Sequence, residues 1–153
     1  MLLAGAFLVE FLSQGRYAPL SALTSTPTRE PLAVPGARVD RYAPAGYSGG
    51  APLVLVHGFA PEGKDDPRVR EAAALLARSG FDVAVPAIPG LTRGRLRADD
   101  VAPVVATLAA RPAPSVVLGV SVGAGPALLA AADPRVRDRV RAVVSLRRLR
   151  VGA

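Results

Sequence analysis

Short apolar runs separated by polar and small residues dominate the hydrophobic pattern of this chain. Four runs of four or five residues, rich in valine, have the composition of strands that are buried on both faces. These runs are Leu53–Val56, Phe81–Val85, Ser115–Gly119 and Ala142–Leu146. A fifth segment, Ala37–Tyr42, alternates apolar and polar residues as a strand does. The pattern therefore predicts five strands over the last three quarters of the chain.

The segments between these strands carry helix signals. Asp66-Pro67 is typical of a helix start, because aspartate caps free N–H groups and proline fits the first helical position, and Gly80 closes the helix. The other predicted helices are 99–110, which opens with two aspartates, 124–132, and a short one that begins at Asp133-Pro134. Strands that alternate with helices predict an α/β fold, with a mostly parallel sheet covered by helices on both faces.

The two ends of the chain differ in composition from its middle. Residues 1–13 form an apolar segment, which we interpret either as the remnant of an anchor or signal or as an amphipathic helix. Residues 14–35, rich in Ser, Thr, Pro and Ala, are predicted to be a linker, 36–146 a partial α/β domain, and 147–153 a basic tail. We expect a cytoplasmic protein, or a membrane-anchored or exported one that associates with membranes through residues 1–12.

Composition narrows the classes of function. The chain has 153 residues and no cysteine, which excludes a disulfide framework, a thiolate metal site and a cysteine nucleophile. Its net charge of +7 comes mainly from arginines that are scattered along the chain, with no helix-turn-helix, zinc finger or aromatic RNA platform. We therefore expect no specific nucleic-acid partner, and no motif predicts a metal or a cofactor.

The candidate chemistry lies after two of the buried strands. Gly119-Val120-Ser121-Val122-Gly123 stands between a strand and a helix, as a nucleophile elbow does. A serine in so sharp a turn needs glycine on both sides, because larger side chains would collide there. His57 and Gly58 follow another strand, and in a parallel sheet both sites fall at the carboxyl edge, where ligands gather.

A second motif competes for the same region. Residues 58–64 fit G-x-x-x-x-G-K after a strand and before a helix, as in a phosphate-binding P-loop. Asp65 stands where a P-loop needs Ser or Thr for magnesium, and Pro61 removes one backbone donor. A P-loop-like nucleotide binder with Lys64 on the phosphates is therefore the third of three hypotheses.

The order of these motifs resembles the α/β-hydrolase family over roughly Ala37 to Leu146. The run 58–67 looks like the dienelactone-hydrolase and acyl-esterase branch, although dienelactone hydrolases carry cysteine where this chain has Ser121. The resemblance implies that Ser121 attacks the carbonyl of a small carboxylic ester, without a cofactor. It also implies that the backbone N–H groups of Phe59 and Val122 form the oxyanion hole.

By the same resemblance, His57, Gly58, Gly119 and Gly123 shape the elbow and the oxyanion loop, and His57 is not the catalytic base. The family order is serine, then acid, then histidine, but His57 is the one histidine of these 153 residues. We therefore expect the N-terminal part of a serine hydrolase, truncated before its acid and histidine and inactive alone. The alternative is a non-catalytic α/β scaffold that binds a small ligand or partner.

Overall fold

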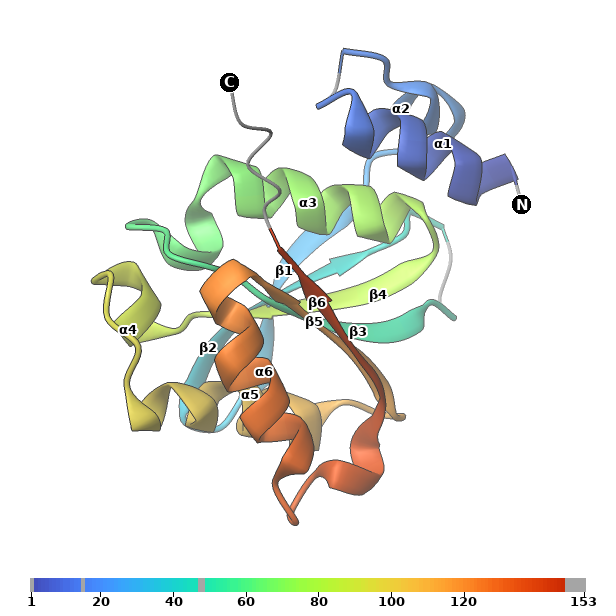
Figure 1. Cartoon of the computed structure of the whole chain (residues 1–153). Coiled ribbons are helices and arrows are strands. Elements are labelled where there is room, and N and C mark those ends of the chain that lie inside the picture. The colour runs from blue at the N-terminus through green and yellow to red at the C-terminus, as the bar shows by residue number, and fades with distance from the viewer. Residues whose placement is uncertain (1, 15, 47–48, 148–153) are drawn as a thin grey trace.

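A six-stranded sheet forms the centre of the molecule (Figure 1), in a computed structural model that describes residues 2–14, 16–46 and 49–147. The strands are β1 (Thr28–Val34), β2 (Ala37–Ala43), β3 (Ala51–Val56), β4 (Phe81–Pro86), β5 (Ser115–Val120) and β6 (Val140–Leu146). Their order across the sheet is β1-β2-β4-β3-β5-β6. Strands β3 to β6 run parallel, whereas β1 and β2 form an antiparallel hairpin and β2 is antiparallel to β4.

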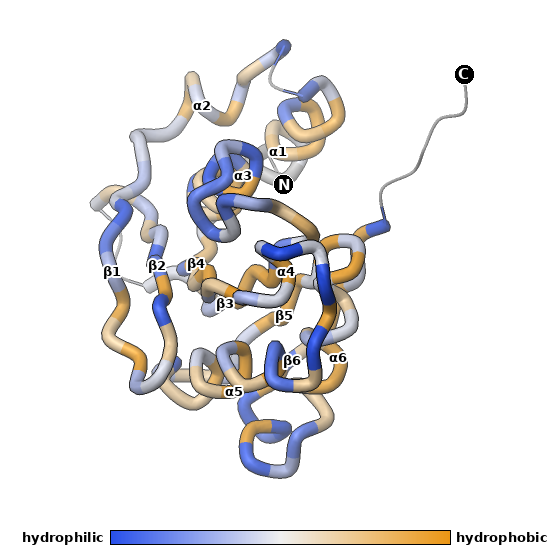
Figure 2. Tube along the Cα trace, turned by 90° about the vertical axis from the view of Figure 1, so that its left-hand side faces the viewer, coloured by the Kyte–Doolittle hydropathy of each residue, from blue (hydrophilic) through white to orange (hydrophobic). Residues whose placement is uncertain are grey.

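Helices cover both faces of this sheet. They are α1 (Leu2–Leu12), α2 (Pro19–Leu23), α3 (Pro67–Arg78), α4 (Pro89–Thr92), α5 (Val101–Ala110) and α6 (Ala124–Ala132). One apolar cluster joins the sheet to α3, and a second joins its other face to α5 and α6. Figure 2 shows the hydrophobic stretches of β3, β4 and β5 between α3 and α5. The predicted fold class, a mostly parallel sheet with helices on both faces, is confirmed.

The predicted helix signals act locally as expected. The Asp66 carboxylate accepts a hydrogen bond from the backbone N–H of Arg68 at 2.9 Å, and Pro67 is the first residue of α3. Gly80, with φ of +103°, ends that helix in a conformation that residues with a Cβ avoid. The buried Asp100 carboxylate accepts from the backbone N–H groups of Gly90 and Arg97, so it also holds the loop before α5.

The prediction of a linker over residues 14–35 is wrong for much of its length. Leu20 of α2 is fully buried against α1 and α3, and β1 pairs with β2 at seven successive positions. The first four residues of β1 are exposed, and Pro31 is tolerated because an edge strand leaves some N–H groups unpaired. A solvent-exposed edge strand lacks the apolar run that marks a central strand, so its composition resembles that of a linker.

The segment after α6 differs from its predicted structure. The predicted short helix after Asp133 is instead a tight turn followed by a 3₁₀ turn at Arg137–Arg139. Residues 148–153 of the predicted basic tail lie outside the described residues. Within the described part of the chain, no helix has the length and apolar character needed to cross a membrane. Membrane association through residues 1–12 stays a prediction.

Candidate active site

Ser121 stands in a sharp turn between β5 and α6. Its φ is +54°, in the left-handed region that non-glycine residues seldom adopt. A left-handed conformation costs about 1–2 kcal/mol for a residue with a Cβ. Strand β5 ends at Val120, a 3₁₀ turn spans Ser121–Gly123, and α6 begins at Ala124. The backbone therefore turns from strand to helix within three residues and stores strain at the serine.

The glycines on either side permit this turn because other backbone segments approach them closely. A Cβ on Gly119 would lie 2.6 Å from the Cα of Ala124, at the start of α6. A Cβ on Gly123 would overlap the carbonyl oxygen of His57 and lie 2.6 Å from that of Val56. Both distances are shorter than any ordinary contact of a methyl group. The glycines thus let the elbow pack between its own helix and the end of β3.

A pocket of about 430 Å³ opens beside this turn, on the face of the sheet that carries α3. Ser121, His57, Gly58 and Phe59 all line it, so the structure brings together four residues singled out from the sequence. Phe59 is about half exposed. Val122 turns its side chain to the other face of the sheet, but its N–H belongs to the turn that opens α6, where helical donors lack partners.

His57 is buried and is held by its own loop. Its side chain is 1% exposed, and Nδ1 lies 2.8 Å from the carbonyl oxygen of Gly58, to which it donates. Burial lowers the pKa of His57, because it disfavours the imidazolium, and the contact with Gly58 opposes this only in part. Nε2 is buried without a hydrogen-bond partner beside Gly63, and among the described residues no hydrogen bond joins His57 to Ser121.

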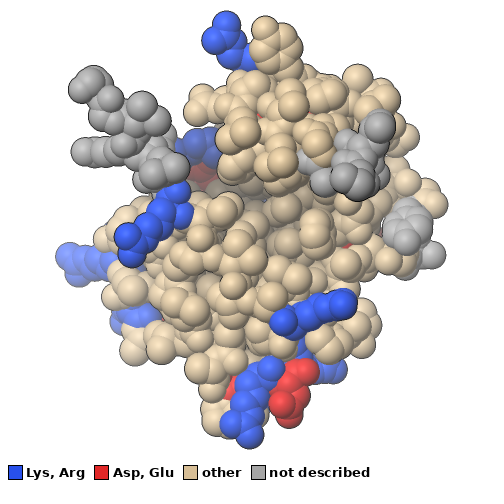
Figure 3. Space-filling view, turned by 45° about the vertical axis from the view of Figure 1, so that its right-hand side comes forward, with Lys and Arg blue, Asp and Glu red and all other residues tan. Residues whose placement is uncertain are grey.

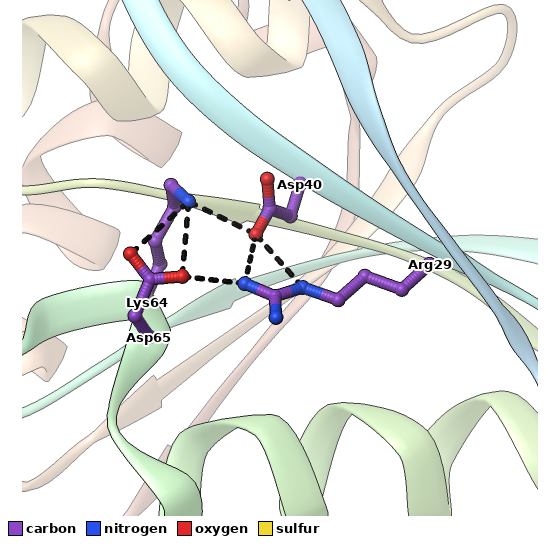
Figure 4. A network of polar contacts seen from close by, with 4 residues as sticks. All are labelled: Arg29, Asp40, Lys64 and Asp65. Carbon is purple, nitrogen blue, oxygen red and sulfur yellow. Dashed lines mark hydrogen bonds and ion pairs between the residues drawn. The ribbon is translucent and has the colours of Figure 1, made fainter.

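Lys64, the lysine of the P-loop hypothesis, belongs to an ion-pair network (Figure 4) and does not line the pocket. Its Nζ lies 3.0 Å from the Asp40 carboxylate and 3.3 Å from that of Asp65. The Arg29 guanidinium contacts the same two carboxylates. The network ties the loop after β3 to the hairpin of β1 and β2, so the charge of Lys64 is balanced by neighbouring carboxylates rather than open to a phosphate.

The N-terminal helix supplies part of the pocket that sequence reasoning missed. Phe7 and Phe11 of α1 line the pocket, with ring centroids 5.7 Å apart and planes inclined by 10°. Their spacing of four residues puts both rings on one face of the helix, and this spacing was the sequence signal that could have identified them.

The surface below the N-terminal helices is visibly hollowed, and Lys and Arg side chains are spread singly over that view (Figure 3). In the part of the chain that the structure describes, no three acidic or histidine side chains group as a metal site would require.

Comparisons with known proteins identify the fold. No protein-family model matches the chain, and no curated protein sequence matches it. Among solved structures, it resembles the dienelactone hydrolase of Anabaena variabilis (TM-score 0.61, 22% identity, covering 79% of this chain and 63% of that one). It also resembles brefeldin A esterase, a bacterial homologue of human hormone-sensitive lipase (TM-score 0.57, 18% identity, 92% and 47% covered). A third is epoxide hydrolase A of Mycobacterium thermoresistibile (TM-score 0.52, 26% identity, 78% and 39% covered).

These likenesses, with the sheet order and the strained turn, show that the chain has the α/β-hydrolase fold. Dienelactone hydrolases and esterases are among the structures it resembles, as the motifs indicated. The chain spans between 39% and 63% of the length of the three proteins named above.

Proposed function

We propose that this chain carries the nucleophile of an α/β-hydrolase-type serine esterase that acts on carboxylic esters, with Ser121 as that nucleophile. The observation that carries the proposal is the positive φ of Ser121 at the wall of a pocket. An ordinary connection between a strand and a helix would place glycine at such a position and avoid about 1–2 kcal/mol of strain. Strain retained at a serine beside a pocket favours a role for its hydroxyl.

The chemistry assigns a task to each group. The Ser121 Oγ forms a bond to the ester carbonyl carbon, its proton passes to a general base, and the developing oxyanion accepts hydrogen bonds from the N–H groups of Phe59 and Val122. The bond from carbon to the alcohol oxygen then breaks, the alcohol leaves with the proton, and water releases the acid from the acyl-enzyme. The names of the dienelactone hydrolase and the esterases that share this fold support the choice of carboxylic esters.

The general base is not assigned to any of the 153 residues. His57 does not fit the role of general base, because its Nδ1 is hydrogen-bonded to the carbonyl oxygen of Gly58 and its Nε2 is buried beside Gly63. No other histidine occurs in the 153 residues. We therefore propose that a base and its orienting acid come from polypeptide outside these residues, and that the 153 residues alone are inactive.

The test is covalent labelling of Ser121 by a fluorophosphonate, which reacts with activated serines. The chain is expressed as it is and also joined to the sequence encoded downstream of Ala153, in each of the three reading frames. We expect labelling in the extended protein that gains a histidine and a carboxylate, and none in its Ser121→Ala variant. If no frame supplies a histidine, or if a folded extended protein labels no better than Ser121→Ala, the esterase proposal fails and the non-catalytic scaffold replaces it.

A further inference from the structure

Much of the lining of the pocket beside Ser121 is apolar. Its apolar residues include Val69 of α3, Leu118 of β5, Leu146 of β6, and Phe7 and Phe11 of α1. Its volume of about 430 Å³ falls within the range of about 300–1,000 Å³ that is usual for small-molecule sites. Such a lining stabilises hydrocarbon and offers no partner to a strongly polar group.

Three charged residues line the pocket: Asp66, Arg68 and Arg147. Asp66 and Arg68 both line it, but they bind each other, with Arg68 Nη2 2.9 Å and Nε 3.1 Å from the Asp66 carboxylate oxygens. The same carboxylate also caps α3. The charges of Asp66 and Arg68 are therefore balanced by each other. Arg147, the residue after β6, is exposed, and its attraction for a carboxylate does not depend on chain length, so discrimination between chain lengths is left to the apolar lining.

Helix α1 is held over the pocket largely by contacts other than those of Phe11. The Glu10 carboxylate accepts hydrogen bonds from the backbone N–H of Ser21, at 3.0 Å, and from its hydroxyl. Leu20 of α2 is fully buried between Ala6 of α1 and Leu75 of α3. Phe7 also packs against this cluster and so takes part in the attachment. Phe11 is 45% exposed and belongs to none of the apolar clusters, so it is the position at which the lining role can be tested separately from attachment of the helix.

We propose that this pocket binds the linear apolar acyl chain of the ester substrate, and that Phe7 and Phe11 are specificity-determining residues that close it. The inference rests on the proposed function, because it takes Ser121 as the point where the acyl carbonyl sits. It goes further by naming the substrate class: esters of unbranched fatty acids longer than butyrate. The segment that the sequence marked as an anchor or amphipathic helix then forms part of the binding site.

The experiment is calorimetric titration of the 153-residue chain with butyrate, hexanoate and octanoate, which are acid products of such esters. We expect affinity to rise by up to about fourfold for each added methylene group, the value for transfer of one methylene out of water. Phe11→Ala should weaken octanoate binding by about tenfold and change butyrate binding by less than about twofold. Phe7→Ala should act in the same direction, and Phe11→Trp should reduce octanoate binding while it spares butyrate.

The matched control is Leu129→Ala, which removes an exposed apolar side chain from α6 on the other face of the sheet and should leave all three affinities unchanged. Each titration is repeated in the Val144→Lys background, which removes an apolar side chain of β6 that does not line the pocket. Thermal melts establish that each variant is folded. If Phe7→Ala does not fold, Phe11→Ala alone tests the acyl-chain proposal.

Equal affinities for butyrate and octanoate, or unchanged octanoate binding in a folded Phe11→Ala variant, would overturn the inference. The two proposals have separate measurements, because labelling reports the reactivity of Ser121 whereas the titrations report binding of the chain by the apolar lining. Failure of fluorophosphonate labelling therefore counts against the esterase alone, and failure of the chain-length series against the acyl pocket alone.

Discussion

At the scale of single residues, the backbone of Ser121 is strained at the position where we propose the nucleophile. Its left-handed conformation is unfavourable for serine and neutral for glycine, so the strain belongs to the residue and not to the surrounding packing. A side chain that is retained at this energetic cost is a stronger indication of function than the G-x-S-x-G pattern, because glycine, serine and valine are common residues.

We expect Ser121→Gly to be more stable than Ser121→Ala by about 1 kcal/mol, because only the alanine keeps a Cβ at positive φ. Urea denaturation of the two variants measures the difference in free energy of unfolding. Both variants lack the hydroxyl group, so the difference between them does not include the effect of losing it. Equal stabilities would mean that the turn relaxes and that no strain is stored at this residue.

The single histidine leads to a second prediction at this scale. The 153-residue chain should hydrolyse p-nitrophenyl acetate no faster than its Ser121→Ala variant, because His57 is buried, neutral and bonded to Gly58. Initial rates measured side by side, with the spontaneous rate subtracted, test this. A rate that depends on Ser121 would contradict the assignment of the base to polypeptide outside these residues, and His57→Ala would then be the next variant to measure.

At the scale of elements, Asp82 links β4 to two neighbours. Its carboxylate lies 2.8 Å from the Arg41 guanidinium on β2 and 3.0 Å from that of Arg111, just after α5. The Arg111 side chain is only 2% exposed and also donates to the backbone carbonyl of Asp82. Burial by itself would raise the pKa of Asp82, but the hydrogen bonds from Arg41 and Arg111 outweigh it and lower the pKa below its ordinary value.

Asp82→Asn should lower the free energy of unfolding by about 3 kcal/mol at pH 7, because it leaves the buried Arg111 charge without its carboxylate. A group with a lowered pKa in the folded state stabilises fully above its unfolded pKa of about 3.9, and this contribution is lost as pH falls through the folded pKa. The difference between the parent chain and Asp82→Asn should therefore shrink below about pH 4.

Urea denaturation at several pH values gives this comparison. Asp99→Asn is the control, because Asp99 is largely exposed and pairs with an exposed Arg97, so its loss should cost less than about 0.5 kcal/mol. If Asp82→Asn cost no more than the control, or if its effect grew toward low pH, the role given to this ion-pair cluster would be wrong.

At the scale of the whole molecule, the two edges of the sheet differ in chemistry. Strand β1 carries Arg29, Glu30 and Pro31, which discourage pairing with another chain, whereas β6 is the last strand on its side in the described part of the chain. Two large apolar side chains of β6 are exposed, Val144 by 41% and Leu146 by 37%. An apolar edge of this kind is a template for association.

We expect the 153-residue chain to self-associate and to bind hydrophobic dyes, and Val144→Lys to reduce both. Light scattering and dye fluorescence over a range of protein concentrations provide the measurement. The matched control is Leu129→Lys, which adds the same charge at an exposed apolar position on α6. A monodisperse parent chain without dye binding, or equal effects of the two lysine variants, would contradict a specific role of the β6 edge.

The features that could be predicted from the sequence are those set by residues close to one another along the chain. The strands β3 to β6, the capped helix after Asp66 and the turn around Ser121 were predictable, because apolar runs, caps and glycines act within a few residues of each other. The predicted burial of β6 on both faces was wrong, because this strand lies at the edge of the sheet and most of its residues are exposed. The β1 strand was not predictable, because an exposed edge strand is stabilised by a neighbour and not by its own composition.

The sequence by itself determined the α/β class, the elbow and the place of His57 and Ser121 at one edge of the sheet, since these depend on local signals and on the rule for parallel strands. Only the tertiary structure decided that His57 bonds to Gly58, that Lys64 pairs with Asp40, and that Phe7 and Phe11 form a wall beside Ser121. Each of those contacts depends on side-chain orientation or joins segments whose relative positions are set when the whole core packs.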